Sequence, residues 1–240
     1  MKRLSFSLLL LLLVLSSCSG FWGRKVRGNG RVVTENRNAG TFNGIDVSGA
    51  IDVYIREDAV RSVRVEADEN LQQYVVVEND GSMLDIHPRD GVNLRPSRSI
   101  RVYVSGPGLS RFSASGACDF FSENKINSAG EVQIDLSGAS DAKLELRAPS
   151  VNVKVSGAGT VTLKGETRDF RVDGSGSTDV KCFDLLAENT SVDLSGAGDA
   201  EVFASVKLDV DVSGAADVRY RGNATVNQRI TGAGSVKKKE

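Results

Sequence analysis

The chain has 240 residues, a formal net charge of −1 and an aromatic content of only 6%. So balanced a charge does not indicate a nucleic acid or an anionic surface as the main partner. The length is enough for a sizeable core in one elongated unit or in two small ones.

The first residues have the organisation of a bacterial export signal. Lys2 and Arg3 precede an apolar run from Leu4 to Leu15, and Cys18 follows two serines. The run is too short to span a bilayer stably, and the basic flank is typical of a secretion signal. The position of the cysteine resembles the bacterial lipobox. We therefore expect residues 1–17 to be removed as a lipoprotein signal peptide and Cys18 to carry lipid; an ordinary signal peptide with an incidental cysteine is the alternative.

Lipidation would decide where the protein lies. Two or three acyl chains hold a protein at a membrane without a spanning helix, because each buried CH₂ contributes roughly 0.8 kcal/mol. The expected partner is a membrane, reached through this lipid anchor. Ser19, in place of an aspartate, favours the outer membrane, and residues 19–22 lack the acidic cluster that marks surface export. We predict a periplasm-facing protein over a surface-displayed one, with a tether over residues 18–40.

A Ser-Gly-Ala repeat is the strongest signal in the sequence. From Gly116 onward the central glycines are 18 to 22 residues apart. Apolar and polar residues alternate on both sides of each glycine, which is typical of a strand with one buried face. The predicted structural repeat glycines are Gly49, Gly116, Gly138, Gly157, Gly176, Gly196, Gly214 and Gly232.

The repeat length indicates the fold. A unit of about 19 residues cannot contain a helix and two strands, and alone it buries too little apolar surface to be stable. We predict an all-β, β-helix-like solenoid over residues 111–240, with one coil of about 19 residues per repeat. A serial sandwich of hairpins is the alternative. Glycine at each bend permits a positive φ or a close approach of two backbones. Residues 41–110 are expected to form a less regular β region, either a cap or a subdomain.

Cys118 and Cys182 are not expected to form a disulfide. Three repeats separate the glycines that precede them, which corresponds to about 14 Å in a stack of coils. A disulfide needs Cα atoms within roughly 7 Å of each other. The prediction is two buried or half-buried free thiols.

Several motifs resemble a known family. They are Gly28-Asn29-Gly30, Arg37, the run from Phe42 to Gly49, the run from Glu66 to Leu71, and the later Ser-Gly-Ala units. Together they look like the head GIN domain, a family of putative autotransporter adhesins common in Bacteroidota, over nearly the whole mature chain. The resemblance implies an all-β, β-helix-like fold in an exported lipoprotein, and it supplies no catalytic residues.

An aspartate stands three residues after most of the repeat glycines. In stacked coils such carboxylates would form a column with a spacing of about 4.8 Å. The favoured interpretation is a turn in which the side chain accepts a backbone N–H just after the bend, because Thr and Ser replace Asp in two repeats. The alternative is a Ca²⁺ site at Asp179, Asp199 and Asp217, since Ca²⁺ binds carboxylate oxygens. No other cofactor is expected. The full set is Asp52, Asp119, Asp141, Asp179, Asp199 and Asp217.

The sequence lacks the residue sets of common enzyme classes. The single histidine, His87, lies outside the regular repeats, which therefore hold no Ser/His/Asp set and no Cys/His zinc site. Their outward positions also show no aromatic row of the kind that sugar-binding platforms use. We predict a non-catalytic adhesion, binding or scaffolding module whose ligand is a glycan, a protein or another copy of the chain. A polysaccharide-active β-helix enzyme that uses surface carboxylates is the alternative.

Overall fold

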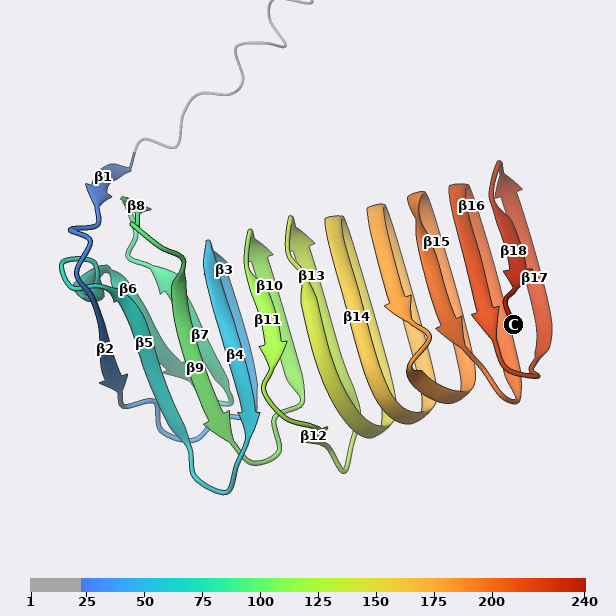
Figure 1. The fold of residues 1–240 in the computed structure, drawn as a ribbon, viewed down its shortest axis with the longest axis horizontal. Helices are drawn as coiled ribbons and strands as arrows, with labels where there is room; N and C mark the ends of the chain where they lie inside the picture. Colours follow the sequence, from blue (N-terminus) through green and yellow to red (C-terminus); the bar gives the residue numbers. More distant parts are fainter. Residues whose placement is uncertain (1–22) are drawn as a thin grey trace, which may run out of the picture.

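The computed structural model describes residues 23–240, so the predicted signal peptide and Cys18 lie outside the described residues. The described chain consists of β-strands and one short 3₁₀ helix, η1 (Gln72–Tyr74). The strands wind into coils that stack side by side along the long axis of the molecule (Figure 1). Between residues 23 and 240 no helix is long and apolar enough to cross a bilayer. The predicted all-β solenoid with a less regular β region is confirmed.

The strands fall into two groups, one before the regular coils and one within them. The first group is β1 (Arg24–Arg27), β2 (Val32–Arg37), β3 (Gly44–Gly49), β4 (Ile51–Glu57), β5 (Ser62–Asp68), β6 (Val75–Asp80), β7 (Met83–Pro88), β8 (Val92–Arg95) and β9 (Ile100–Gly106). The second group is β10 (Arg111–Gly116), β11 (Asp119–Ser122), β12 (Ile126–Asn127), β13 (Val132–Gly138), β14 (Ala142–Cys182), β15 (Leu185–Phe203), β16 (Lys207–Arg221), β17 (Thr225–Gly232) and β18 (Ser235–Lys238).

Each regular coil has one extended segment before its glycine and one after it, and in β14, β15 and β16 the two segments continue through the glycine as one strand. Equivalent strands of successive coils pair in parallel and in register, as in β10 with β13, β13 with β14 and β14 with β15. Because side chains alternate along a strand, one half of them points into the coil and stacks in columns. Ile134 and Val153 are neighbours in one such column, and both are fully buried. The aliphatic core therefore runs the length of the stack.

The repeat glycines lie on top of one another, as the sequence predicted. Strand pairing aligns Gly116 with both Gly49 and Gly138, and it aligns the remaining glycines in the same way except at one step. At that step a Cβ on Gly176 would meet the carbonyl oxygen of Gly157, so these two are stacked as well. Gly138 has a φ of 82°, and a Cβ there would come within 2.5 Å of the Gly116 carbonyl oxygen. Both its conformation and the available space require glycine.

In the N-terminal half the coils do not follow chain order. The coil of β3 and β4 lies between the coil of β7 and β9 and the coil of β10 and β11. Antiparallel strands β2, β5 and β6 then close this end of the stack. This detour explains why the regular period is lost between Gly49 and Gly116. Pro88 contacts Gly49 where a repeat glycine would otherwise lie, and β8 is inserted between β7 and β9.

Residues 24–27 and 32–37 form strands, which corrects the expectation of a tether for this part of residues 18–40. β1 pairs in parallel with β8, and β2 pairs antiparallel with β5. These two strands are mostly exposed and rich in charged residues. No apolar alternation marks them in the sequence, because long-range backbone pairing rather than burial defines them.

Asp68 and Asn70 fix the N-terminal segment to the fold. The Asp68 carboxylate accepts hydrogen bonds from the Gly30 backbone N–H at 2.7 Å and from the backbone N–H and hydroxyl of Ser97 at 2.8 and 2.7 Å. The Asn70 side chain donates to the Arg27 carbonyl at 2.8 Å. Two of the family-like motifs noted in the sequence thus meet here, and their role in this structure is to hold the ends of β1 and β8.

Substitution of a stacked glycine should destabilise the coil far more than substitution of a loop glycine. Gly138→Ala should lower the free energy of unfolding by about 2 kcal/mol or more, because it combines backbone strain with a steric overlap. Gly130→Ala is the matched control, since a Cβ there meets nothing within 4 Å. Urea unfolding of both variants measures the difference, and equal stabilities would contradict the stacked corner.

Asp68 should stabilise the fold in a pH-dependent way. Burial acts to raise the pKa of Asp68, but the hydrogen bonds from Ser97 and Gly30 outweigh it and lower the pKa below its ordinary value. A lowered pKa means that this stabilisation is present above pH of about 4 and is lost as the pH falls through the folded-state pKa. Asp68→Asn should lower the free energy of unfolding by about 2 kcal/mol at neutral pH.

Unfolding at neutral and acidic pH checks this expectation. The difference in the free energy of unfolding between the wild type and Asp68→Asn should become smaller on acidification. Asp184→Asn, at an exposed position, serves as the control and should change little at either pH. A gap that stays constant with pH would show that the carboxylate charge is not what holds the segment.

Candidate functional site

The aspartates after the glycines form hydrogen bonds between coils. Asp119 Oδ1 accepts the backbone N–H of Asp141 at 3.1 Å, and Asp141 Oδ1 accepts that of Thr160 at 2.7 Å. Asp179 accepts the N–H of Asp199 in the same way at 3.3 Å. The structure thus differs from the expected local turn, in which the acceptor serves its own bend. Each of these carboxylates helps to hold the next coil in register.

The aspartates proposed for calcium have protein partners. Asp199 Oδ2 accepts a hydrogen bond from Arg219 at 3.1 Å, and Asp217 Oδ1 accepts one from the Ser235 hydroxyl at 2.7 Å, which lowers the pKa of Asp217. Within residues 23–240, no group of three or more His, Cys, Asp or Glu side chains is arranged to hold a metal ion. The geometry of Asp179, Asp199 and Asp217 therefore gives the calcium alternative no support.

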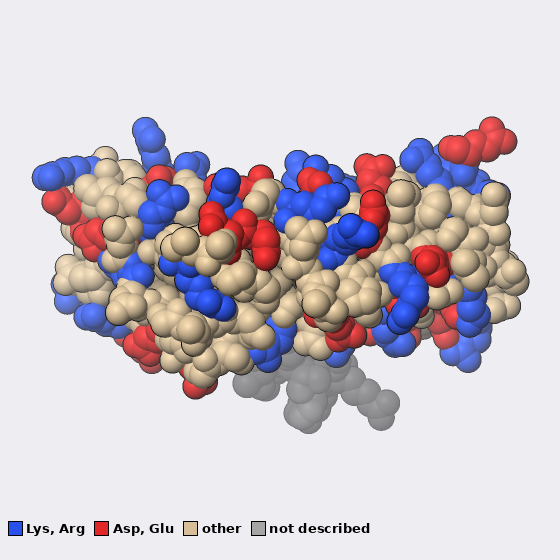
Figure 2. All heavy atoms as spheres, turned by 90° about the horizontal axis from the view of Figure 1, so that it is seen from below, with Lys and Arg blue, Asp and Glu red and all other residues tan. Residues whose placement is uncertain are grey.

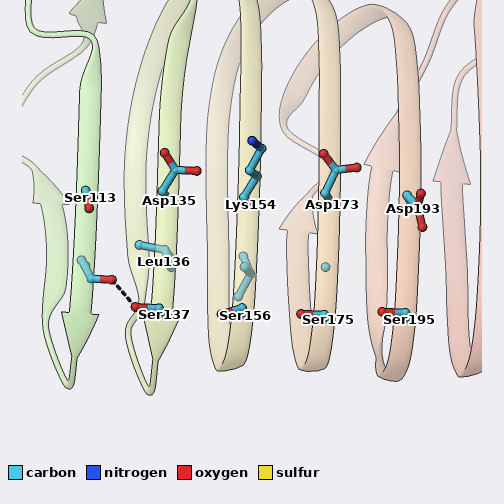
Figure 3. Close-up of a pocket in the computed structure, with 13 residues that line it drawn as sticks. Ser113, Asp135, Leu136, Ser137, Lys154, Ser156, Asp173, Ser175, Asp193 and Ser195 are labelled. Atoms are coloured by element: carbon cyan, nitrogen blue, oxygen red, sulfur yellow. Dashed lines mark hydrogen bonds between the residues drawn. The ribbon is translucent and has the colours of Figure 1, made fainter.

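A groove crosses the coils on the outer face of the sheet that precedes the glycines. It has a volume of about 480 Å³ and spans β10, β13, two passes of β14, and β15. Figure 3 shows two rows of side chains in it, running perpendicular to the strands. One row is Ser137, Ser156, Ser175 and Ser195, and the other is Asp135, Lys154, Asp173 and Asp193.

The groove repeats a serine at each coil, beside a charged residue that is Asp in three coils and Lys154 in one. Pairing puts Asp135 beside Lys154 and Ser137 beside Ser156, one coil apart. The step between equivalent groups is about 4.8 Å, the spacing of paired strands. A second hollow of about 400 Å³, which shares Asp193 with the first, continues across β16 to β17. Hydroxyls that donate and accept and carboxylates that accept are therefore offered at regular intervals along most of the solenoid.

A stack of aromatic side chains lies on the opposite sheet, in the N-terminal half. The rings of Tyr54 and Tyr103 are 5.1 Å apart, and those of Tyr54 and Phe121 are 5.2 Å apart. The guanidinium of Arg64 lies over Tyr103 at 5.2 Å from its ring centroid. This row was not predicted from the sequence, because its members come from β9, β4 and β11, which are neighbours in space but not in chain order. Tyr54 and Phe121 each stand five residues after a repeat glycine, which is the one signal that could have joined them.

The aromatic stack is better suited to stability than to sugar binding. A sugar packs on the open face of an aromatic ring, and here Tyr54 lies between Phe121 and Tyr103, while Tyr103 lies between Tyr54 and Arg64. All three aromatic residues are half-buried. The stack packs the coil of β9 against those of β4 and β11. We do not propose it as a ligand site.

Cys118 and Cys182 are free and buried, which confirms the prediction of unpaired thiols. Burial raises the pKa of Cys118 to about 11 and that of Cys182 to about 12. Because the thiolate is the reactive form, these side chains are core residues and are not placed to act as nucleophiles.

His87 lies at the end of β7 beside its own chain neighbours. Its Nδ1 is 3.0 Å from the Pro88 carbonyl oxygen, and its Nε2 is 4.0 Å from Asp85. Because β7 pairs with β3 and Pro88 contacts Gly49, His87 lies in the coil next to the first Ser-Gly-Ala corner. It is not among the residues that line the groove. On the face of the molecule that Figure 2 shows from below, positive and negative side chains are mixed.

Comparison with known proteins agrees with this fold. A family model described as putative auto-transporter adhesin, head GIN domain, matches residues 41–224. A putative adhesin from Bacteroides fragilis NCTC 9343 is 20% identical with a TM-score of 0.85, over 89% of this chain and all of that one. A putative lipid binding protein from Parabacteroides distasonis ATCC 8503 is 20% identical with a TM-score of 0.68, over 90% of this chain and all of that one.

A putative adhesin from Parabacteroides merdae ATCC 43184 is also 20% identical, with a TM-score of 0.64 over 91% of this chain and all of that one. At these identities the likeness concerns the fold. No curated protein matches the sequence. The family match extends over most of the described residues, from the first coil to the end of β16. The chain therefore belongs to the family of the putative auto-transporter adhesin, head GIN domain.

Proposed function

We propose that this protein is a non-catalytic adhesion or binding module of the cell envelope, held to a membrane by lipid on Cys18. Its ligand is an extended polymer, a glycan or a polypeptide, that lies in the groove across the coils. The observation that carries this proposal is the groove itself, in which serine and aspartate positions recur coil after coil.

The repeated spacing favours a polymer over a small ligand. A small molecule would occupy one or two coils and gain few contacts in an open groove. A long chain laid across the coils meets a serine at each step of about 4.8 Å, beside an aspartate in three coils and Lys154 in one, so many weak contacts add together. Polar hydroxyl and carboxylate groups suit sugar hydroxyls or backbone amides. Membership of a family described as adhesins, and relatives with the same description, support a binding role of this kind.

The alternative of a polysaccharide-active enzyme receives less support from the groove. Asp173 is paired with Arg171 by two hydrogen bonds of 3.0 and 2.9 Å, so its carboxylate already has a cationic partner. Glycoside hydrolysis needs two carboxyl groups in different environments, one of them with a raised pKa. The groove carboxylates stand in a single row along the coils, with Asp173 directly beside Asp193, instead of on two opposing sides of a cleft. This arrangement is suited to holding a chain.

Two bulky substitutions in the groove should block binding. We expect Ser156→Arg combined with Ser175→Arg to weaken binding at least about tenfold, because each guanidinium side chain fills one step of the groove. Thr160→Arg with Thr162→Arg, on the opposite sheet of the coil that contains Ser156, adds the same two side chains and the same charge and is the matched control. Residues 19–240, which contain every described strand, would be screened on arrays of oligosaccharides and matrix proteins, and hits would be titrated calorimetrically.

Two outcomes would count against this proposal. One is a hit whose affinity is the same for the groove variant and the wild type. The other is release of reducing ends from a bound polysaccharide, which would support the enzyme.

Lipid attachment has its own test. Cys18→Ser should abolish incorporation of an alkyne-labelled fatty acid and should leave the signal uncleaved, because the thiol carries the lipid that precedes cleavage. Fatty-acid labelling, molecular mass and membrane fractionation are compared between the wild type and Cys18→Ser. Protection from protease added to intact cells is the expected result for a periplasm-facing protein. A Cys18→Ser protein that is still labelled would disprove attachment at this residue.

A further inference from the structure

Positive charge is concentrated around the two-stranded sheet of β1 and β8. Residues 24–31 and 89–98 contain seven basic side chains and one acidic side chain, and all seven basic residues are exposed. They are Arg24, Lys25, Arg27, Arg31, Arg89, Arg95 and Arg98. Outside these segments and the predicted signal, 21 basic and 30 acidic side chains remain. The near-neutral total conceals this separation, which is why the composition did not suggest an anionic partner.

The strand register puts part of this charge on one face. Arg24, Val26, Val92 and Leu94 share one side of the sheet, and Lys25, Arg27 and Arg95 share the other. Val92 and Leu94 cover an apolar hollow of about 210 Å³ left where the coil of β7 and β9 lacks a glycine corner. The inner side of the sheet is therefore held against the fold. Lys25, Arg27 and Arg95 are left on the outer side, which we call the β1–β8 basic face.

The β1–β8 basic face is held in place by the fold. Backbone pairing of β1 with β8 extends from Arg24 to Arg27. The Gly28 N–H donates to the Arg95 carbonyl at 2.9 Å, and Asn70 binds the Arg27 carbonyl. Asp68 then fixes the segment that follows β8 through Ser97. The cations are thus presented by an ordered surface instead of a loose tail, which lowers the entropic cost of contact with a partner.

These cations have few partners inside the protein. Of the seven, only Arg31 has a carboxylate within 4.0 Å among the described residues, namely Glu69 at 3.3 Å. Arg89 lies over the ring of Tyr74 at 5.6 Å. By contrast, many cations of the coils are paired, such as Lys164 with Glu145 at 2.8 Å. The charge of the β1–β8 basic face is available to an external anion.

We propose that the β1–β8 basic face lies on an anionic membrane surface and binds the phosphates of acidic lipids. The inference rests on the lipid anchor at Cys18 proposed above, which brings this face close to a bilayer, although the contact with acidic lipid does not itself need the lipid chain. Only four residues separate Cys18 from Gly23, and the five steps from one to the other span at most about 18 Å when extended. A bilayer is therefore the anionic surface nearest to this face. The acidic excess of the coils would keep the rest of the solenoid away from the same surface.

Vesicle binding of residues 19–240, which lack the lipidated cysteine, tests the proposal separately from lipid attachment. Sedimentation with phosphatidylcholine vesicles that contain phosphatidylglycerol should remove the protein from solution, whereas pure phosphatidylcholine should not. Lys25→Gln with Arg27→Gln and Arg95→Gln should reduce the partition coefficient about 100-fold, because each basic residue near an anionic surface contributes about fivefold. Binding should weaken strongly from about 0.1 M to about 1 M NaCl, where the Debye length falls from about 10 to about 3 Å.

The matched control replaces the same number of exposed cations elsewhere, as Lys143→Gln, Lys181→Gln and Lys237→Gln, and should bind as the wild type does. Equal loss in the control would show a general charge effect and would overturn the proposal, as would equal binding to both kinds of vesicle. Tighter binding to duplex DNA than to acidic vesicles would assign the face to a nucleic acid instead. Circular dichroism of each variant excludes unfolding as the cause. Loss of vesicle binding with unchanged ligand binding in the groove separates the two proposals.

Discussion

The close approach of one glycine corner to the next is the constraint on which the structure depends. At Gly138 the backbone lies so near the Gly116 carbonyl that no side chain fits between them. Successive coils are therefore held in one register at their corners, and backbone pairing continues this register along both sheets. A shift of the strand pairing by one residue would turn the inward side chains outward. By fixing the register, the glycine corner therefore also keeps the apolar side chains in the core. Every surface property of the solenoid follows from columns that this register creates.

How far the fold could be predicted from the sequence depended on whether chain order and spatial order agree. In residues 111–240 each coil carries its own glycine and its own alternation, so local pattern was enough. The coil of β7 and β9 has Pro88 at the corner position and lies beneath a coil that precedes it in the chain. Neither fact leaves a periodic signal. β1 and β2 were missed for another reason, because they are held by long-range hydrogen bonds and bury little.

Whether a candidate site could be predicted also depended on whether its residues are neighbours in the chain or only in space. The column of aspartates was visible in the sequence, but its hydrogen bonds to the next coil were not, because a local turn and a contact between coils place the same residue types at the same spacing. To predict the groove, one would have had to recognise that the outward serines and aspartates of several coils align in two parallel rows. The β1–β8 basic face needed the pairing of segments about 70 residues apart, of which only Gly28-Asn29-Gly30 had been noted as a motif.

A surface made of columns also explains why its chemistry can vary at one coil without loss of the rest. Lys154 stands in a row of aspartates, and Arg229 pairs with Asp211 one coil away. In water, like charges about 4.8 Å apart repel by only about 0.9 kcal/mol, so a row of carboxylates is tolerated and a single change of sign is tolerated too. A ligand that spans several coils averages over such changes, whereas a ligand bound at one coil would depend on each of them. Regular stacking therefore favours recognition of long chains, and it leaves attachment to a surface to the one irregular corner where β1 and β8 stand outside the stack.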